Sequence, residues 1–193
     1  SLGNVRVLLD EAGKAGVKYI SIWGFSTENW KRSDAEKKFL FKILTKTAKD
    51  FRKYALENGI RVKHFGRKDR LPRKVVSALE TLEKETSEYN KMNVHLLLDY
   101  GGRDEIVRAV NKAIKEGKAV TEEKFYNYLD TAGIPEPELV IRTGGEKRLS
   151  GLMPFQTVYS ELYFTDVFFP DFGREELQEA LDWFSERRRN FGK

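Results

Sequence analysis

The segment RTGGEKRLS, residues 142–150, combines three cationic side chains, two adjacent glycines and two hydroxyl groups directly after the apolar run ELVI. Adjacent glycines let the backbone turn tightly and approach an anion without a Cβ in the way. Arginines can hold phosphate oxygens through bidentate hydrogen bonds. We therefore interpret residues 142–150 as a diphosphate-binding loop, in preference to a surface loop with solvated arginines. Its candidate substrate-binding residues are Arg142, Arg148 and Ser150.

A second polar segment, FSTENWKR, occupies residues 25–32 and follows a predicted strand. Asn29 and Arg32 carry donors that suit an anionic or polarised substrate. Ser26 can instead form local turn bonds with its neighbours or cap the next helix. Trp30 can equally well serve only to fill space in the core. The residue types alone leave both interpretations of this segment open.

A third candidate is Glu161, which lies within the apolar and aromatic segment VYSELYF. A carboxylate in such surroundings needs a partner. That partner is either an arginine of the diphosphate-binding loop or Mg²⁺, which binds one or two carboxylates together with phosphate oxygens. His64 and His95 stand alone on predicted strands, and we expect both to be packed there. Neither a G-x-x-x-x-G-K-[ST] nor a G-x-G-x-x-G motif is present.

The elements that must position these residues alternate between strands and helices. Apolar spacing and caps predict helices at 2–15, 33–59, 72–90, 103–116, 121–130 and 173–189. Strands are predicted at 17–25, 60–66, 93–102, 138–142 and within 160–170. This alternation predicts an α/β fold with a mainly parallel central sheet flanked by helices on both faces. Because ligands bind beyond the carboxyl ends of parallel strands, residues 24–32, 99–103 and 142–150 should meet on one rim of that sheet.

Composition narrows the class of partner. Lys and Arg number 35 against 30 Asp and Glu, so the formal net charge is +5. Such a balance favours an anionic partner, or else it only keeps the surface solvated. We expect no nucleic-acid partner, because no recognised module or aromatic-interleaved basic run is present. Cysteine is absent and no apolar run approaches the ~18 residues of a membrane span, so we expect a cytoplasmic protein.

Four segments taken together resemble the cis-prenyltransferase family of undecaprenyl diphosphate synthase-like enzymes. They are FSTENWKR, YGGRDEIVRAV, LVIRTGGEKRLS and SELYFTDVFFPDF, in this order and with suitable spacing. The resemblance extends over nearly the whole chain, which it identifies as a single domain spanning 1–193. It implies condensation of isopentenyl diphosphate with an allylic diphosphate, with Mg²⁺ assisting the leaving group, to give a longer cis-polyprenyl diphosphate. The metal motif D-D-x-x-D of the all-α trans-prenyltransferases is absent.

The resemblance also implies a role for each candidate residue. Arg142, Arg148 and Ser150 are similar to the ligands of isopentenyl diphosphate, and Glu161 to a metal-linked glutamate. Ser26, Asn29 and Arg32 match positions that help proton removal and substrate placement, and Trp30 matches the family's tryptophan. A product tunnel would be lined by Leu40, Ile43 and Leu44. Family membership further implies a homodimer, for which the run LYFTDVFF is a candidate interface, and peripheral membrane contact through the lipid product.

Three features depart from the family pattern. The family opens with a strand and a Met-Asp-Gly-Asn-x-Arg-Trp-Ala segment whose Asp holds Mg²⁺, and the sequence contains no such segment. We therefore expect this N-terminal strand and first loop to be missing, and little activity from these 193 residues alone. Asp99 stands where the family usually has Asn, and SGLMPFQ differs from the usual aromatic-rich run. A non-catalytic subunit of a prenyltransferase complex is the alternative function.

Overall fold

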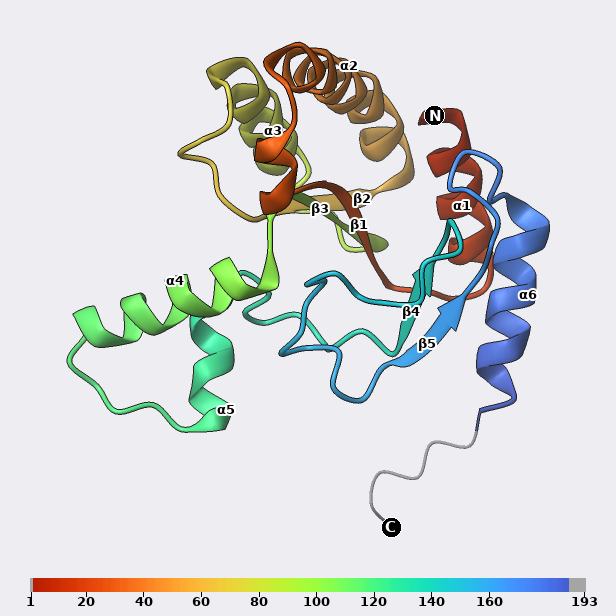
Figure 1. The fold of residues 1–193 in the computed structure, drawn as a ribbon. Helices are drawn as coiled ribbons and strands as arrows, with labels where there is room; N and C mark the ends of the chain where they lie inside the picture. Colours follow the sequence, from red (N-terminus) through yellow and green to blue (C-terminus); the bar gives the residue numbers. More distant parts are fainter. Residues whose placement is uncertain (1, 188–193) are drawn as a thin grey trace. The chain divides into compact units, whose positions relative to one another are not determined.

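A computed structural model describes residues 2–187 and shows two compact units, which we describe separately (Figure 1). Unit 2 consists of Lys18–Pro135 and Gly151–Phe155. Unit 1 takes in the remaining described residues, 2–17, 136–150 and 156–187. Every strand ladder in the described chain is parallel, and helices lie between successive strands except β4 and β5. The predicted α/β class is therefore confirmed, although the described strands form two sheets.

Unit 2 is built on a three-stranded parallel sheet in the order β1-β3-β2. Its strands are β1 (Tyr19–Ser26), β2 (Ile60–Phe65) and β3 (Met92–Tyr100). The central strand β3 is buried at most positions, as its nearly continuous apolar sequence predicts. Parallel order places the carboxyl ends of all three strands at the same edge of the sheet.

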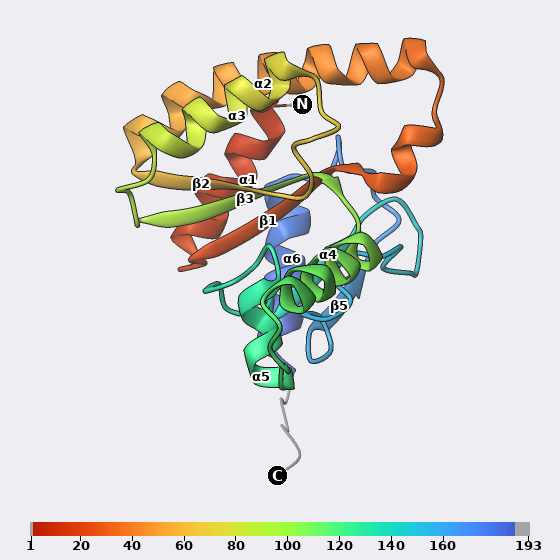
Figure 2. The same ribbon diagram turned by 90° about the vertical axis from the view of Figure 1, so that its left-hand side faces the viewer.

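Helices cover both faces of this sheet (Figure 2). The helices α2 (Asp34–Asn58) and α3 (Arg73–Glu85) run along one face, where Phe25 and Leu98 pack against Val75 and Leu79. The helices α4 (Gly102–Lys115) and α5 (Glu122–Phe125) lie on the other side. There, a second cluster contains Phe65, Leu97, Tyr100 and Met153.

The ends of α2 follow from its sequence. At the N-terminus, the Ser33 hydroxyl accepts a hydrogen bond from the Glu36 amide at 3.3 Å, and the Glu36 carboxylate accepts one from the Ser33 amide at 3.0 Å. This is a capping box, which satisfies donors that the first helical turn leaves free. At the C-terminus, Gly59 adopts a left-handed conformation with φ of +65°. The predicted caps of this helix are confirmed.

Unit 1 contains the parallel pair β4 (Leu139–Arg142) and β5 (Glu161–Phe164), with α1 (Leu2–Lys14) and α6 (Arg174–Ser185). The two helices contact one another, and Arg174 pairs with Glu11 at 2.9 Å. Helix α6 also reaches β5, because the Trp183 ring meets the Tyr163 ring edge-on with centroids 5.3 Å apart. The Asn4 side chain fastens α1 to the loop before α6 by donating to the Phe169 carbonyl oxygen at 2.8 Å.

Some element predictions were wrong in detail. The helix predicted at 121–130 is limited to α5 and a 3₁₀ turn, η2 (Tyr126–Tyr128). Helix α3 ends at Glu85 instead of residue 90, and α6 ends at Ser185, while positions 188 and 189 of its predicted range lie outside the described residues. Among the expected tunnel residues, Leu40 and Leu44 pack on the core, but Ile43 is 42% exposed. No helix in the described part of the chain could cross a membrane.

Candidate functional site

Polar segments follow all three strands of unit 2 at the shared carboxyl edge, which we call the rim. The 3₁₀ turn η1 (Thr27–Lys31) follows β1, residues 99–103 end β3, and residues 66–71 follow β2. The close approach of two of these segments requires a glycine, because a Cβ on Gly101 would lie 2.2 Å from the Thr27 hydroxyl oxygen. The prediction that residues 24–32 and 99–103 meet is confirmed. The third predicted segment belongs to unit 1, so its place on this rim stays a prediction.

A buried carboxylate organises the rim. Asp99 has 0% exposure and a left-handed backbone with φ of +51°. Its side chain accepts a hydrogen bond from the Trp30 indole nitrogen at 2.7 Å and from Arg70 Nε at 2.9 Å. The Arg70 guanidinium also lies 5.5 Å from the centre of the Trp30 ring. One carboxylate thus joins the ends of β1, β2 and β3, because each partner comes from a different strand end.

The left-handed backbone of Asp99 also redirects the end of β3. Successive strand residues normally point to opposite faces, so Leu98 and Tyr100 should share a face. Instead Leu98 belongs to the cluster under α2 and α3, and Tyr100 to the cluster that contains Leu97. Asp can adopt this conformation because its short polar side chain can bond locally. The turn in the chain therefore brings the Tyr100 hydroxyl to the α4 side of the sheet.

A second buried network fastens α4 below the rim. The Tyr100 hydroxyl donates to Glu105 at 2.6 Å, and the other Glu105 oxygen accepts the Asp130 amide at 2.9 Å. Asp130 in turn binds both terminal nitrogens of Arg108, at 2.8 and 2.6 Å. Burial, and then the neighbouring Glu105 carboxylate, raise the pKa of the Tyr100 hydroxyl well above its usual range. This hydroxyl is therefore a fixed donor that holds Glu105 of α4.

The predicted catalytic residues of β1 and η1 lie together on the rim. Asn29 Oδ1 accepts the Ser26 amide at 2.9 Å, which is a local turn bond, and the Asn29 amide nitrogen has no partner within the described chain. Arg32 is exposed at the C-terminal end of η1. Trp30 packs edge-on against Phe25, with ring centroids 5.7 Å apart. The structural alternatives given for Ser26 and Trp30 are therefore present in the fold, and they leave Arg32 and one Asn29 donor available to a substrate.

In unit 1, the diphosphate-binding loop starts with the tight turn that its sequence predicts. Gly144 and Gly145 have φ of +83° and +77°, a conformation that other residues seldom adopt. Their amides already donate to the backbone oxygens of Val167 and Thr165, both at 2.9 Å. The two glycine amides therefore shape the loop and are not free to donate to an anion.

The three predicted ligands of this loop differ in their surroundings. Arg142 ends β4, and its Nε is buried without a hydrogen-bond partner in the described chain. A buried donor without an acceptor is costly and is usually explained by an absent ligand or water. Arg148 is 63% exposed and forms an ion pair with Glu146, whereas Ser150 is exposed with a left-handed φ of +52°. Arg142 is therefore the residue best placed to hold a buried anion.

Glu161 is not brought next to Arg142. In the β4–β5 ladder Glu161 is opposite Leu139, and Arg142 is opposite Phe164. The two residues are thus three positions apart along the ladder, roughly 10 Å, and their side chains project from opposite faces. No ion pair of Glu161 occurs among residues 2–187, so the alternative of an arginine partner finds no support.

A metal site needs oxygen ligands, and Glu161 is the candidate. Within the described residues, no group of three or more His, Cys, Asp or Glu side chains could hold a metal ion. Mg²⁺ commonly takes one or two carboxylates together with phosphate oxygens and water, so a single free carboxylate fits its chemistry. A diphosphate shared between this ion and Arg142 fits the structure less well, because Glu161 and Arg142 project from opposite faces of the β4–β5 ladder.

The two histidines are packed on strands, as predicted. His64 Nε2 lies 2.8 Å from the Leu98 carbonyl oxygen, and His95 Nδ1 lies 3.1 Å from the Ser21 hydroxyl. Burial lowers the pKa of both rings, that of His95 to about 4.

Sequence reasoning missed Arg67 and Arg70, which reach the rim from the end of β2. Arg67 donates to Asp104 of α4 at 3.2 Å, and Arg70 binds Asp99. A signal was available, because the segment GRKDR follows a predicted strand that had to end at the same edge of a parallel sheet. Nothing in the sequence distinguished these arginines from solvated ones.

The fold and these strand-end loops define an α/β protein with cationic and hydrogen-bonding groups at the ends of parallel strands. A family model described as putative undecaprenyl diphosphate synthase matches residues 1–192. An isoprenyl transferase from Aquifex pyrophilus is 40% identical over 187 residues, covering 96% of this chain and 81% of that protein. One from Fusobacterium nucleatum is 43% identical over 189 residues, covering 97% and 82%. The chain belongs to the cis-prenyltransferase family, and this membership supports cis-prenyl chain elongation as its activity.

Solved structures agree with this assignment. A probable undecaprenyl diphosphate synthase from Campylobacter jejuni has a TM-score of 0.92 and 31% identity, covering 99% of this chain and 91% of that one. Lavandulyl diphosphate synthase from Lavandula x intermedia, in complex with dimethylallyl diphosphate, has a TM-score of 0.94 and 32% identity, covering 100% and 86%. The similarity therefore extends over both units described above.

Proposed function

We propose that the protein condenses isopentenyl diphosphate with an allylic diphosphate and releases a longer cis-polyprenyl diphosphate. The observation that carries this proposal is Arg142, whose buried Nε has no acceptor in the described chain at the start of the diphosphate-binding loop. A diphosphate supplies the charged acceptor that such a donor needs. Arg148 and Ser150 would add donors from the same loop.

The rim residues of unit 2 are proposed to act on the reacting groups. The Asn29 amide and Arg32 would orient a substrate, and Ser26 would assist proton removal. Trp30 would position the substrate while remaining fixed by its bond to Asp99. Mg²⁺ would be held by Glu161 and would help the diphosphate to leave. In the β4–β5 ladder, however, Glu161 and Arg142 project from opposite faces.

An assay with purified protein, isopentenyl diphosphate, several allylic diphosphates and Mg²⁺ tests the proposal. We expect longer prenyl products, and a 10- to 100-fold lower kcat/KM for Arg142→Ala, because one charged hydrogen-bonding partner of the diphosphate is lost. Arg52→Ala is the matched control, since it removes an arginine of α2 that pairs with Glu85. Absence of any longer product with every primer would refute the activity.

Metal binding needs a separate measurement. Manganese spectroscopy with inorganic diphosphate present should detect a bound ion that Glu161→Gln weakens. Equal binding by both proteins would assign the ion to other groups.

A non-catalytic subunit of a prenyltransferase complex remains the second candidate. Its motivation is the family's Met-Asp-Gly-Asn segment, which residues 1–193 do not contain. This candidate predicts diphosphate binding without turnover, and activity only after a catalytic partner is added.

A homodimer is also part of the proposal. Unit 1 exposes an apolar set around β5, with exposures from 37% to 68%: Val158, Tyr159, Leu162, Phe168 and Phe169. Exposed apolar groups of this kind are typical of protein interfaces. Phe168→Ser should shift the sedimentation coefficient from that of a dimer to that of a monomer.

Cytoplasmic location and membrane contact through the lipid product are further proposals.

A further inference from the structure

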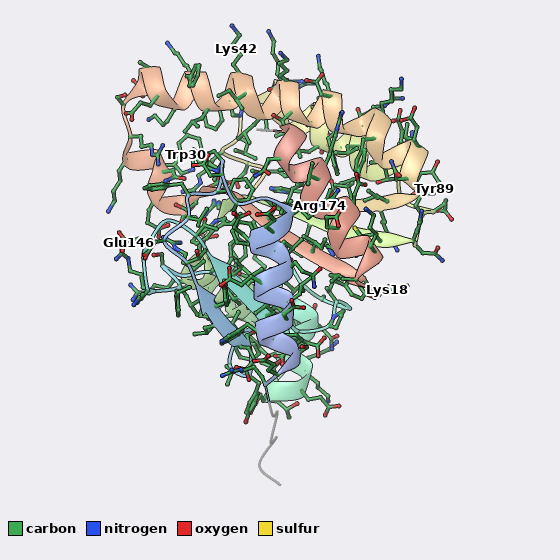
Figure 3. All side chains as sticks on the ribbon, turned by 90° about the vertical axis from the view of Figure 1, so that its right-hand side faces the viewer. Lys18, Trp30, Lys42, Tyr89, Glu146 and Arg174 are labelled. Carbon is green, nitrogen blue, oxygen red and sulfur yellow. The ribbon has the colours of Figure 1, made fainter. Side chains whose placement is uncertain are left out.

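The outward side of α2 carries a continuous row of lysines. Their spacing of three or four residues places them on one helix face, over a length of roughly 22 Å. They are Lys38, Lys42, Lys46, Lys49 and Lys53, and all five are exposed. Lys53 pairs with Glu57 at 3.7 Å, and the other four form no ion pair among the described residues. Figure 3 shows Lys42 extending away from the helix.

Two large apolar side chains border this row. Phe39 is 64% exposed and Ile43 is 42% exposed, one helical turn further on. They do not belong to the buried face of α2, which is formed by Ala48, Phe51 and Ala55. Exposed aromatic and branched residues on a helix are costly to leave in water. We call the five lysines together with Phe39 and Ile43 the α2 lysine face.

We propose that the α2 lysine face docks on an anionic lipid bilayer. A helix lies in a membrane interface when a basic face meets the headgroups and adjacent apolar residues enter the acyl boundary. Lysines alone would suit nucleic acid equally well, but Phe39 and Ile43 would gain nothing from a phosphate backbone. Asp50 lies two turns beyond Ile43 on the same side of the helix, and the five lysines outnumber this exposed carboxylate. The contact needs no lipid product, so it goes beyond the proposed catalytic cycle.

Vesicle co-sedimentation without substrate tests this inference. We expect binding to phosphatidylcholine vesicles that contain about 30% phosphatidylglycerol, weak binding to pure phosphatidylcholine, and a decrease as salt rises. Each lysine near an anionic surface changes the partition coefficient by roughly fivefold, so Lys42→Gln, Lys46→Gln and Lys49→Gln together should weaken it roughly a hundredfold. A control variant replaces Lys91, Lys115 and Lys124 by Gln. Both triple variants lower the formal net charge from +5 to +2.

The control variant should bind vesicles within about twofold of the parent protein. A loss equal to that of the α2 variant would assign binding to overall charge and overturn the proposal, as would no binding by the parent. Phe39→Ser with Ile43→Ser should also weaken vesicle binding, since both side chains are exposed and the core is untouched. If this pair changed nothing, or if duplex RNA displaced the vesicles, the surface would be a polyanion site instead. Because substrate is absent, loss of prenyl transfer cannot produce either result.

Discussion

Asp99→Asn is the substitution that most directly tests how the rim is held. Asn keeps the size of the side chain and tolerates the left-handed backbone at φ of +51°. It removes the charge opposite Arg70, however, and replaces one acceptor oxygen by a donor. A hydrogen bond to a charged group contributes about 1.5–3 kcal/mol. Because the Arg70 side chain is 37% exposed and regains some water, we expect a loss of about 2 kcal/mol in the free energy of unfolding.

Urea unfolding followed by far-UV circular dichroism measures this loss. Asp69→Asn is the matched control, since it removes a carboxylate that is 62% exposed and pairs with Arg67 at 2.6 Å. Exposed pairs contribute about 0–1 kcal/mol, so the control should change stability by less than half as much. A double-mutant cycle of Asp99→Asn with Arg70→Met should give a coupling energy above about 1 kcal/mol. Equal stability of the two Asn variants would refute the argument that Asp99 organises the rim.

Two further predictions concern strand β3 and the helix α4 that follows it. Gly102→Ala should destabilise the protein by about 1–3 kcal/mol, because the added Cβ would lie 1.9 Å from Pro154 Cδ. Thermal unfolding measures this loss. The control, Gly117→Ala, should lose less stability, because a Cβ there meets no atom within 4 Å and only the left-handed φ of +64° is strained. His95 has a pKa lowered by burial from 6.5 to about 4, so its contribution to stability is full above pH 6.5 and is lost as the pH falls toward 4. The unfolding free energy of the parent should decrease by about 3 kcal/mol more over that interval than that of His95→Gln, and parallel pH profiles would contradict the assignment.

Much of the fold could be predicted because hydrophobic spacing and caps act locally. Helix α2 is the clearest case, since Ser33, Glu36 and Gly59 mark its ends in the sequence as they do in the structure. The helix predicted at 121–130 is shorter because α5 gives way to a 3₁₀ turn, which its residue types do not reveal. Ile43 illustrates a further limit. It follows Leu40 at helical spacing, yet it lies outside the buried stripe, and only the packing of α2 on the sheet determines which edge of a stripe is covered.

The site was predictable in its residue types and less so in its geometry. Strand order was needed to see that Arg70, Asp99 and Trp30 meet, since they are far apart in sequence. The strand register was needed to see that Glu161 and Arg142 point to opposite faces, because a shift of one residue would reverse the result. The sequence of a strand does not reveal its neighbours in the sheet, and strands as short as β4 and β5, with four residues each, do not reveal their register.

Four arginines at strand ends and on α4 differ in whether their donors are already occupied. Arg67, Arg70 and Arg108 each bind a carboxylate that is largely shielded from solvent, so an incoming anion would have to displace a fixed partner. Arg142 has a buried donor with no acceptor in the described chain, so an anion would gain a hydrogen bond there without breaking one. The first group therefore stiffens the loops, whereas the free donor of Arg142 is consistent with the substrate contact that we propose for it. If this division is correct, Arg70→Met should reduce stability more than substrate affinity, and Arg142→Met should do the reverse.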